Sequence, residues 1–98
     1  MGYTTRQTKI SGDQGVDIIA TQGSRIVAIQ TKCQKAKVSN AAVQEVVAGK
    51  VMYNATECMV VTNSFFTQSA IDLAQENKVE LWDRYELIKR IEEAGIRE

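Results

Sequence analysis

The sequence predicts an α/β fold in which a mixed β-sheet is flanked by helices, with the elements in the order β-β-β-α-β-α-β-α. Threonine-rich and β-branched segments separated by glycine turns fill residues 4–32. After residue 39, segments with helical periodicity alternate with short apolar runs, which places neighbouring strands parallel to one another. A chain of 98 residues, 44% of them apolar, suits one hydrophobic core, so we expect a single domain over residues 1–98.

Three strands are expected in the first third of the chain. Residues 4–10 form the first and end at a glycine-containing turn over residues 11–15, after which residues 16–21 form the second. The Gln22-Gly23-Ser24 loop suits a hairpin, and residues 26–32 continue as a third strand with β-branched side chains on both faces. Together these segments predict a three-stranded meander.

A helix and a buried strand should follow. Ser39 or Asn40 can cap a helix that runs to about residue 54, because apolar residues recur there at helical spacing: Val43, Val46, Val47 and Val51. Residues 58–62 are a short continuous apolar run, typical of a strand that is buried on both faces. We expect that strand to be central in the sheet.

The last third predicts helix, strand and helix. Thr67 is placed to cap a helix through residue 76, and residues 79–82 read as another short strand. Asp83 followed by Glu86 resembles a capping box at the start of a final helix. That helix should bury one stripe of large residues: Tyr85, Ile88 and Ile91.

The chain carries no sign of secretion, membrane insertion or zinc binding. Its N-terminus lacks the basic and apolar regions of a signal peptide, and no apolar run approaches the roughly 20 residues that cross a bilayer. Cys33 and Cys58 lack C-x-x-C spacing, and the chain has no histidine, so two buried, reduced thiols are expected. We therefore expect a cytoplasmic protein with no membrane partner.

Charge is unevenly spread although the net charge is zero. Residues 25–50 contain five basic residues and one acid, whereas residues 72–98 contain five basic residues and eight acids. A locally positive surface can hold phosphate groups, although such a run is also a common solvated face. The candidate DNA contacts are Lys35 and Lys37, which flank the third strand, and Lys50, for which packing of its stem along the apolar helix face is the favoured alternative.

Three polar residues are expected to converge at one end of the first hairpin. Gln30 and Lys32 lie two apart on a strand and so share a face, and Asp17 opens the strand that pairs with theirs. The Asp17 carboxylate, the Gln30 side-chain carbonyl and the Thr31 backbone carbonyl are hard oxygen donors suited to Mg²⁺, with Mn²⁺ as a substitute. Lys32 would orient or deprotonate water and stabilise the negative charge that develops at phosphorus.

Blocks of residues that match one family occur along most of the chain. They are Gly2-Tyr3, Ser11-Gly12-Asp13-Gln14-Gly15-Val16-Asp17, Ile29-Gln30-Thr31-Lys32, Val43-Gln44-Glu45-Val46, Val61-Thr62-Asn63-Ser64, Phe66-Thr67 with Ser69-Ala70, and Glu80-Leu81-Trp82-Asp83. In these blocks the chain resembles the Mrr-type restriction endonuclease-like family, a branch of the PD-(D/E)xK nucleases in its D…QxK form. The resemblance implies that Asp17, Gln30 and Lys32 bind the metal and catalyse cleavage.

The resemblance also bears on the helix expected before the first strand and on the helix predicted to run to about residue 54. The family core normally begins with a helix before the first strand, which this sequence lacks. Either the sequence is truncated or another subunit covers the exposed sheet face, and of the two we expect the second, in a homodimer. Gln44 and Glu45 are accessory candidates. Gln44 falls at the margin of the apolar stripe, from which it could reach the site, whereas Glu45 should project from the opposite side.

The leading hypothesis is a Mg²⁺-dependent DNA endonuclease that hydrolyses phosphodiester bonds, in a system that restricts foreign or modified DNA. One alternative is a junction-resolving or DNA repair nuclease, whose core has the same architecture. The other is a non-catalytic nucleic-acid-binding or assembly module, which the missing first helix and the neutral net charge favour. Phe65, Phe66 and Trp82 are expected in the core rather than as platforms for stacked bases.

Overall fold

The predicted order of elements is confirmed in a computed structural model that describes residues 2–7 and 18–95. Three of the predicted features, the end of the first strand (residues 8–10), the turn over residues 11–15 and the start of the second strand, lie outside the described residues. The elements are β1 (Thr4–Gln7), β2 (Ile18–Gln22), β3 (Arg25–Lys32), α1 (Asn40–Met52), β4 (Glu57–Thr62), α2 (Gln68–Glu76), β5 (Glu80–Trp82) and α3 (Arg84–Glu93).

The five strands form one mixed sheet in the order β1-β2-β3-β4-β5. β1, β2 and β3 pair antiparallel, and the turn between β2 and β3 places Gly23 at φ +60°, a backbone conformation that glycine adopts without strain. β3, β4 and β5 pair parallel, as the alternation of helix and strand predicted. β4 is an interior strand between β3 and β5, so the prediction for its apolar run also holds.

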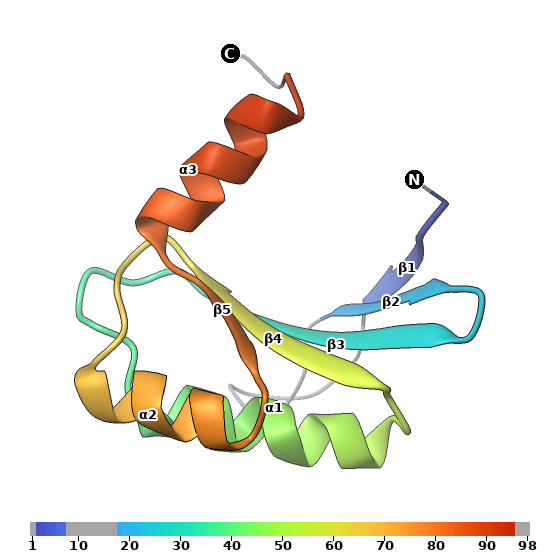
Figure 1. Cartoon of the computed structure of the whole chain (residues 1–98), viewed down its shortest axis with the longest axis horizontal. Helices are drawn as coiled ribbons and strands as arrows, with labels where there is room; N and C mark the ends of the chain where they lie inside the picture. Colours follow the sequence, from blue (N-terminus) through green and yellow to red (C-terminus); the bar gives the residue numbers. More distant parts are fainter. Residues whose placement is uncertain (1, 8–17, 96–98) are drawn as a thin grey trace.

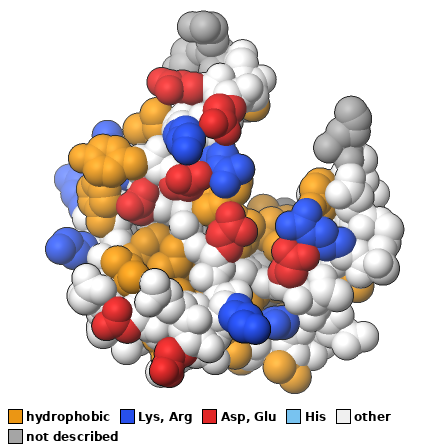
Figure 2. All heavy atoms as spheres, in the orientation of Figure 1, with side chains coloured by type: hydrophobic (Ala, Val, Ile, Leu, Met, Phe, Trp, Pro, Cys, Tyr) orange, Lys and Arg blue, Asp and Glu red, His pale blue; other side chains and the backbone are white. Residues whose placement is uncertain are grey.

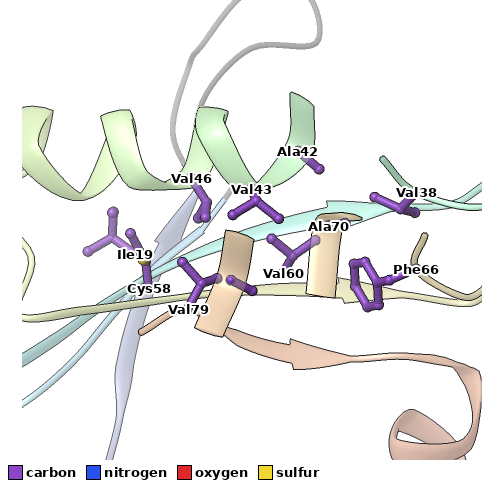
Figure 3. Close-up of a cluster of buried hydrophobic side chains, with 12 residues drawn as sticks. Ile19, Val38, Ala42, Val43, Val46, Cys58, Val60, Phe66, Ala70 and Val79 are labelled. Carbon is purple, nitrogen blue, oxygen red and sulfur yellow. The ribbon is translucent and has the colours of Figure 1, made fainter. Parts of the chain in front are cut away.

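One face of the sheet is covered by α1 and α2, and the main hydrophobic core lies beneath them (Figures 1 and 3). Alternate residues of β3 and β4 point into this core, because successive side chains of a strand face opposite sides of the sheet. Its buried members are Ile19, Ala28, Val38, Ala42, Val43, Val46, Cys58, Val60, Phe66, Ala70, Ala74 and Val79. Gln30 and Lys32 continue the same alternation from Ala28, so they too face the helices.

The buried stripe of α1 differs from the predicted one. It consists of Ala42, Val43, Val46 and Gly49, whereas Val47 is half-buried and Val51 is exposed. The valine pattern misplaced the stripe because it gave no weight to alanine and glycine, whose small size lets the helix approach the sheet closely. The true stripe is centred about a quarter turn away from the predicted one, and this shift changes which polar residues of α1 flank it.

Two predicted helix caps are confirmed. The Thr67 hydroxyl accepts a hydrogen bond from the backbone N–H of Ala70 at 3.1 Å, and the Asp83 carboxylate accepts one from the backbone N–H of Glu86 at 3.0 Å. Ser39 is the N-cap residue of α1, but its side chain makes no capping hydrogen bond. No helix in residues 2–7 and 18–95 is long and apolar enough to cross a membrane.

α3 does not bury the stripe that its sequence predicted. Tyr85, Ile88 and Ile91 are all exposed, Tyr85 to 72%, and no residue of this helix is buried. The reason is visible in Figure 1, where α3 rises from the end of the sheet instead of lying on one of its faces. Tyr85 still makes an edge contact with Phe65, with ring centroids 5.2 Å apart.

The other face of the sheet carries a smaller apolar cluster. Ala20, Val27 and Met59 are buried there, with Ile29, Val61 and Trp82 packed against them. Figure 2 shows the hollow above this face, between α3 and the N-terminal strand, and its cavity measures about 480 Å³. Phe66 is buried as predicted, whereas Phe65 and Trp82 are only half-buried. The prediction of two buried thiols holds for Cys58 but is wrong for Cys33, which is exposed just past the end of β3.

Candidate active site

Gln30 and Lys32 lie together at the carboxyl end of β3, on the face covered by α1. They pair in register with Val60 and Thr62 of the parallel strand β4. Gln30 is only 2% exposed, and the side chain of Lys32 is 23% exposed. The site is therefore a buried amide beside a partly shielded ammonium group.

Glu45 of α1 contacts both of these side chains through one oxygen atom. Its Oε1 accepts a hydrogen bond from Gln30 Nε2 at 2.7 Å and lies 3.7 Å from Lys32 Nζ. The expectation that Glu45 projects away from the site is wrong, because the true buried stripe of α1 places Glu45 on the flank that faces β3. Gln44 is exposed and lines a shallow hollow with Val47 and Leu73, away from Gln30.

The contact with Glu45 fixes which way the Gln30 amide points. An ionised carboxylate can only accept hydrogen bonds, so the amide nitrogen must face it and the amide oxygen must face elsewhere. That oxygen, Gln30 Oε1, is buried and has no hydrogen-bond partner among the described residues. A buried carbonyl without a partner costs roughly 1–3 kcal/mol, so such an atom calls for a ligand that completes its coordination.

A second buried oxygen, Asn40 Oδ1, is also unpaired within the described part of the chain. It belongs to the first residue of α1. The Gln30 amide donates to a charged group, Glu45, which also pairs with Lys32.

Hydrogen bonds hold the carboxyl end of β3 in place. The buried Thr62 hydroxyl donates to the carbonyl oxygen of Lys32 at 2.6 Å and accepts from the backbone N–H of Ser64 at 3.0 Å. The Ser64 hydroxyl lies within hydrogen-bond distance of the carbonyl oxygens of Lys35 and Ala36. The loop that follows Lys32 is thus tied to the end of β4.

Lys35 and Lys37 are exposed on this loop, close to the end of β3. Lys35 also borders a small cleft of about 230 Å³ with Gln34, Asn63, Ser64, Phe65 and Arg84. Neither Lys35 nor Arg84 forms an ion pair within the described residues, and the cleft has no acidic lining residue there. No sequence pattern marks Arg84 for this role, because only the fold brings the start of α3 beside the lysine loop.

Lys50 lies at the other end of the sheet. It is in the last turn of α1, near Glu57 and Cys58, and its charge helps to lower the pKa of Glu57. Burial raises the pKa of the Cys58 thiol. Cys58 pairs with Ala28, four residues before Lys32, a distance of about 13 Å along a strand. Lys50 therefore does not join the group formed by Lys32, Lys35 and Lys37.

Asp17 lies outside the described residues. The next residue, Ile18, pairs with Ile29, which directly precedes Gln30. Thr31 continues β3 beside Val61, and its backbone carbonyl as a ligand stays a prediction. Within residues 2–7 and 18–95 no three His, Cys, Asp or Glu side chains gather as a metal site. The predicted ligand set does not require one, since it combines Asp17 with an amide oxygen and a backbone carbonyl.

Comparison with known proteins supplies one family and one fold. A model of the Mrr-type catalytic domain, described as a restriction endonuclease, matches residues 1–91. Among solved structures, a protein of unknown function named AF1548 superposes with a TM-score of 0.69 at 18% identity, over 84% of this chain and 50% of that one. At that identity the likeness shows the fold alone, and the present chain spans half of that protein's length. A search of curated proteins finds no match.

Proposed function

Because the chain belongs to the Mrr-type restriction endonuclease family, and so carries a nuclease domain of restriction type, we propose that it is a Mg²⁺-dependent DNA endonuclease. In this proposal Asp17, Gln30 and Lys32 form the active site, the products are those of phosphodiester hydrolysis, and the role is restriction of foreign or modified DNA. The proposal treats residues 1–98 as one catalytic domain.

The observation that carries the proposal is the Gln30 side-chain oxygen, which has no hydrogen-bond partner in the residues that the structure describes. It is buried at the carboxyl end of β3, next to a lysine, in a chain of a nuclease family. An amide oxygen is a hard ligand of the kind that Mg²⁺ and Mn²⁺ accept. The residues present therefore fit a divalent cation, for which Gln30 supplies one ligand.

Each site residue has a distinct part in the proposed reaction. Asp17, the Gln30 amide oxygen and the Thr31 carbonyl would hold the cation, which when bound supplies Lewis-acid polarisation of the phosphate and a more acidic water. Sequence adjacency supports the inclusion of Asp17, because it directly precedes Ile18, whose partner Ile29 adjoins Gln30. Lys32 orients the attacking water and stabilises charge as phosphorus becomes five-coordinate.

The same proposal includes a path for the DNA backbone. Lys35 and Lys37 lie on the loop next to Lys32, and Arg84 adds a further cation across the small cleft. Arginine and lysine at such positions contact phosphates and fix the register of the duplex without reading its sequence. Phosphate contacts on this side would bring a scissile bond toward Lys32.

Plasmid nicking tests the proposal. Purified protein should nick supercoiled plasmid with Mg²⁺ or Mn²⁺ and not with a chelator, and Lys32→Ala should reduce the rate by about 100-fold or more, as for loss of a group that stabilises transition-state charge. Lys89→Ala, which removes an exposed lysine of α3, is the matched control and should nick like the wild type.

Three results would contradict the proposal. Equal nicking by the wild type and Lys32→Ala would mean a contaminating nuclease. Retained DNA binding without cleavage by any variant would identify a non-catalytic binding module. Cleavage confined to branched DNA would replace restriction by junction resolution.

A further inference from the structure

We infer that Glu45 is a positioning residue of the active site, which acts on the metal through Gln30 rather than by binding the metal itself. The inference rests on the proposed function, since it gives Gln30 a metal to bind. It starts from the two interactions of one atom, Glu45 Oε1, with Gln30 Nε2 at 2.7 Å and with Lys32 Nζ at 3.7 Å.

Glu45 determines the orientation of the Gln30 amide. A glutamine side chain can present either its nitrogen or its oxygen in a given direction, and only the oxygen can bind a cation. Glu45 accepts a hydrogen bond from the nitrogen, and the buried oxygen has no partner among residues 2–7 and 18–95. Without Glu45 the amide could rotate and offer its N–H₂ group toward the cation, which would repel it.

Glu45 orients a metal ligand and does not bind the metal itself. Its Oε1 already accepts a hydrogen bond from the Gln30 amide N–H and lies near the Lys32 ammonium group. This oxygen, which faces β3, is therefore occupied by these two partners. Its side chain comes from a helix that packs against the sheet, and it is 29% exposed. This is the arrangement of an outer partner that orients a ligand, and loss of such partners typically weakens metal binding about 10- to 100-fold.

Glu45 also positions the ammonium group of Lys32. Because the same oxygen faces both residues, Glu45 sets the position of the ammonium group relative to the amide. Residues two apart on a strand would otherwise keep their long side chains in several rotamers. One carboxylate thus orders the predicted metal ligand and the predicted catalytic lysine at once.

A double-mutant cycle on Mn²⁺ affinity tests this inference without relying on activity. The variants are Glu45→Ala, Gln30→Met and both together, with Glu76→Ala as a control that removes an exposed acid from α2. Mn²⁺ binding is measured by electron paramagnetic resonance, and thermal unfolding is followed in parallel. Asp17 remains in every variant, so residual affinity should stay measurable.

If Glu45 acts through Gln30, Glu45→Ala should weaken Mn²⁺ binding about tenfold in the wild-type background. In the Gln30→Met background the same change should have no further effect, because the amide that it orients is gone. Glu76→Ala should bind Mn²⁺ like the wild type. Glu45→Gln, which keeps an acceptor oxygen, provides a milder second variant for the same cycle in case Glu45→Ala does not fold.

Other outcomes would overturn the inference. Losses that multiply in the double variant would make Glu45 an independent ligand or a remote charge. A lower unfolding temperature with unchanged Mn²⁺ affinity would make it a merely structural residue. A wild-type protein that cleaves DNA while Glu45→Ala binds Mn²⁺ normally would reject this inference alone, whereas a wild type that neither binds Mn²⁺ nor cleaves would reject the proposed function with it.

Discussion

The two ends of β3 each carry a polar cluster, and the two clusters differ in how completely their atoms are paired. At the amino end, Arg25 and Glu57 form a two-point ion pair with N–O distances of 2.5 and 2.9 Å, and Arg25 also contacts the Tyr3 hydroxyl. At the carboxyl end, Gln30 donates to Glu45, but its oxygen has no partner within the described part of the chain.

The environments of the two clusters differ as well. The side chains of Arg25 and Glu57 are 51% and 42% exposed, so water can satisfy whatever the ion pair leaves over. Gln30 is 2% exposed, and water does not reach its oxygen easily. The paired atoms of the surface cluster are accounted for by their contribution to local stability. A buried polar atom without a partner among the described residues indicates instead that a ligand binds there.

The largest effect is expected from a substitution that breaks the carboxyl-end cluster. Gln30→Met keeps the volume of the side chain but removes the amide oxygen, so Mg²⁺-dependent plasmid cleavage should fall by about 100-fold, near the upper range for disturbed metal sites. Glu57→Gln, at the amino end, should cleave at the wild-type rate. Initial nicking rates at saturating Mg²⁺ measure both, and similar losses in the two variants would remove the functional distinction between the clusters.

The same substitution should separate function from stability. Gln30→Met removes an oxygen that has no partner among the described residues, which should stabilise the fold without metal, but it also removes the hydrogen bond to Glu45, so the free energy of unfolding is expected to change by less than about 1 kcal/mol. Urea denaturation in the presence of a chelator measures this change. A loss of 2 kcal/mol or more would mean that Gln30 is held for the stability of the sheet.

DNA binding should also distinguish the two ends. Lys35→Ala and Arg84→Ala are each expected to weaken binding about fivefold near 0.15 M salt, and each should reduce the slope of log K against log salt by about 0.9, as for one lost phosphate contact. Arg25→Ala removes a cation from the other end and should leave both quantities unchanged. Fluorescence anisotropy with a catalytically inactive Lys32→Ala background provides the measurement, and an equal effect of Arg25→Ala would argue for diffuse charge attraction.

The smallest effect is expected from the amino-end ion pair. The hydrogen bond from Arg25 holds the pKa of Glu57 below its ordinary value of 4.5. A carboxyl group whose pKa is lower in the folded state stabilises fully at neutral pH and loses that contribution as the pH falls below 4.5 toward the folded value. Glu57→Gln should therefore cost less than about 1 kcal/mol at pH 7, and the cost should shrink as the pH falls below 4.5. Urea midpoints measured over a pH series test this, and a cost that grows as the pH falls below 4.5 would contradict it.

Much of the fold followed from periodicity and turn chemistry in the sequence. The alternation after residue 39 predicted the parallel strands, and Thr67 and Asp83 marked helix starts that the structure confirms. These signals are local, since a cap or a hairpin is decided by residues a few positions apart. Gln30 and Lys32 could be paired in advance for the same reason, because they are two apart on one strand.

Features that depend on packing between distant segments were not predictable in this way. The side of α1 that faces the sheet was set by Ala42 and Gly49, whose small size matters only against a specific strand, and this hid the contact of Glu45 with Gln30. The exposure of Tyr85 likewise depends on α3 leaving the sheet at its end. The assignment of Asp17 to the active site comes from the sequence and the family resemblance.

The most direct test of the central claim is to locate the cation on the protein. Mn²⁺ titrated into isotope-labelled protein broadens the NMR signals of nearby nuclei, and the Gln30 side-chain amide with the backbone amides of Thr31 and Lys32 should broaden first. The signals of Arg25 and Glu57 should stay sharp at the same Mn²⁺ concentration. Sharp Gln30 signals, or first broadening at the Arg25–Glu57 end, would contradict the account.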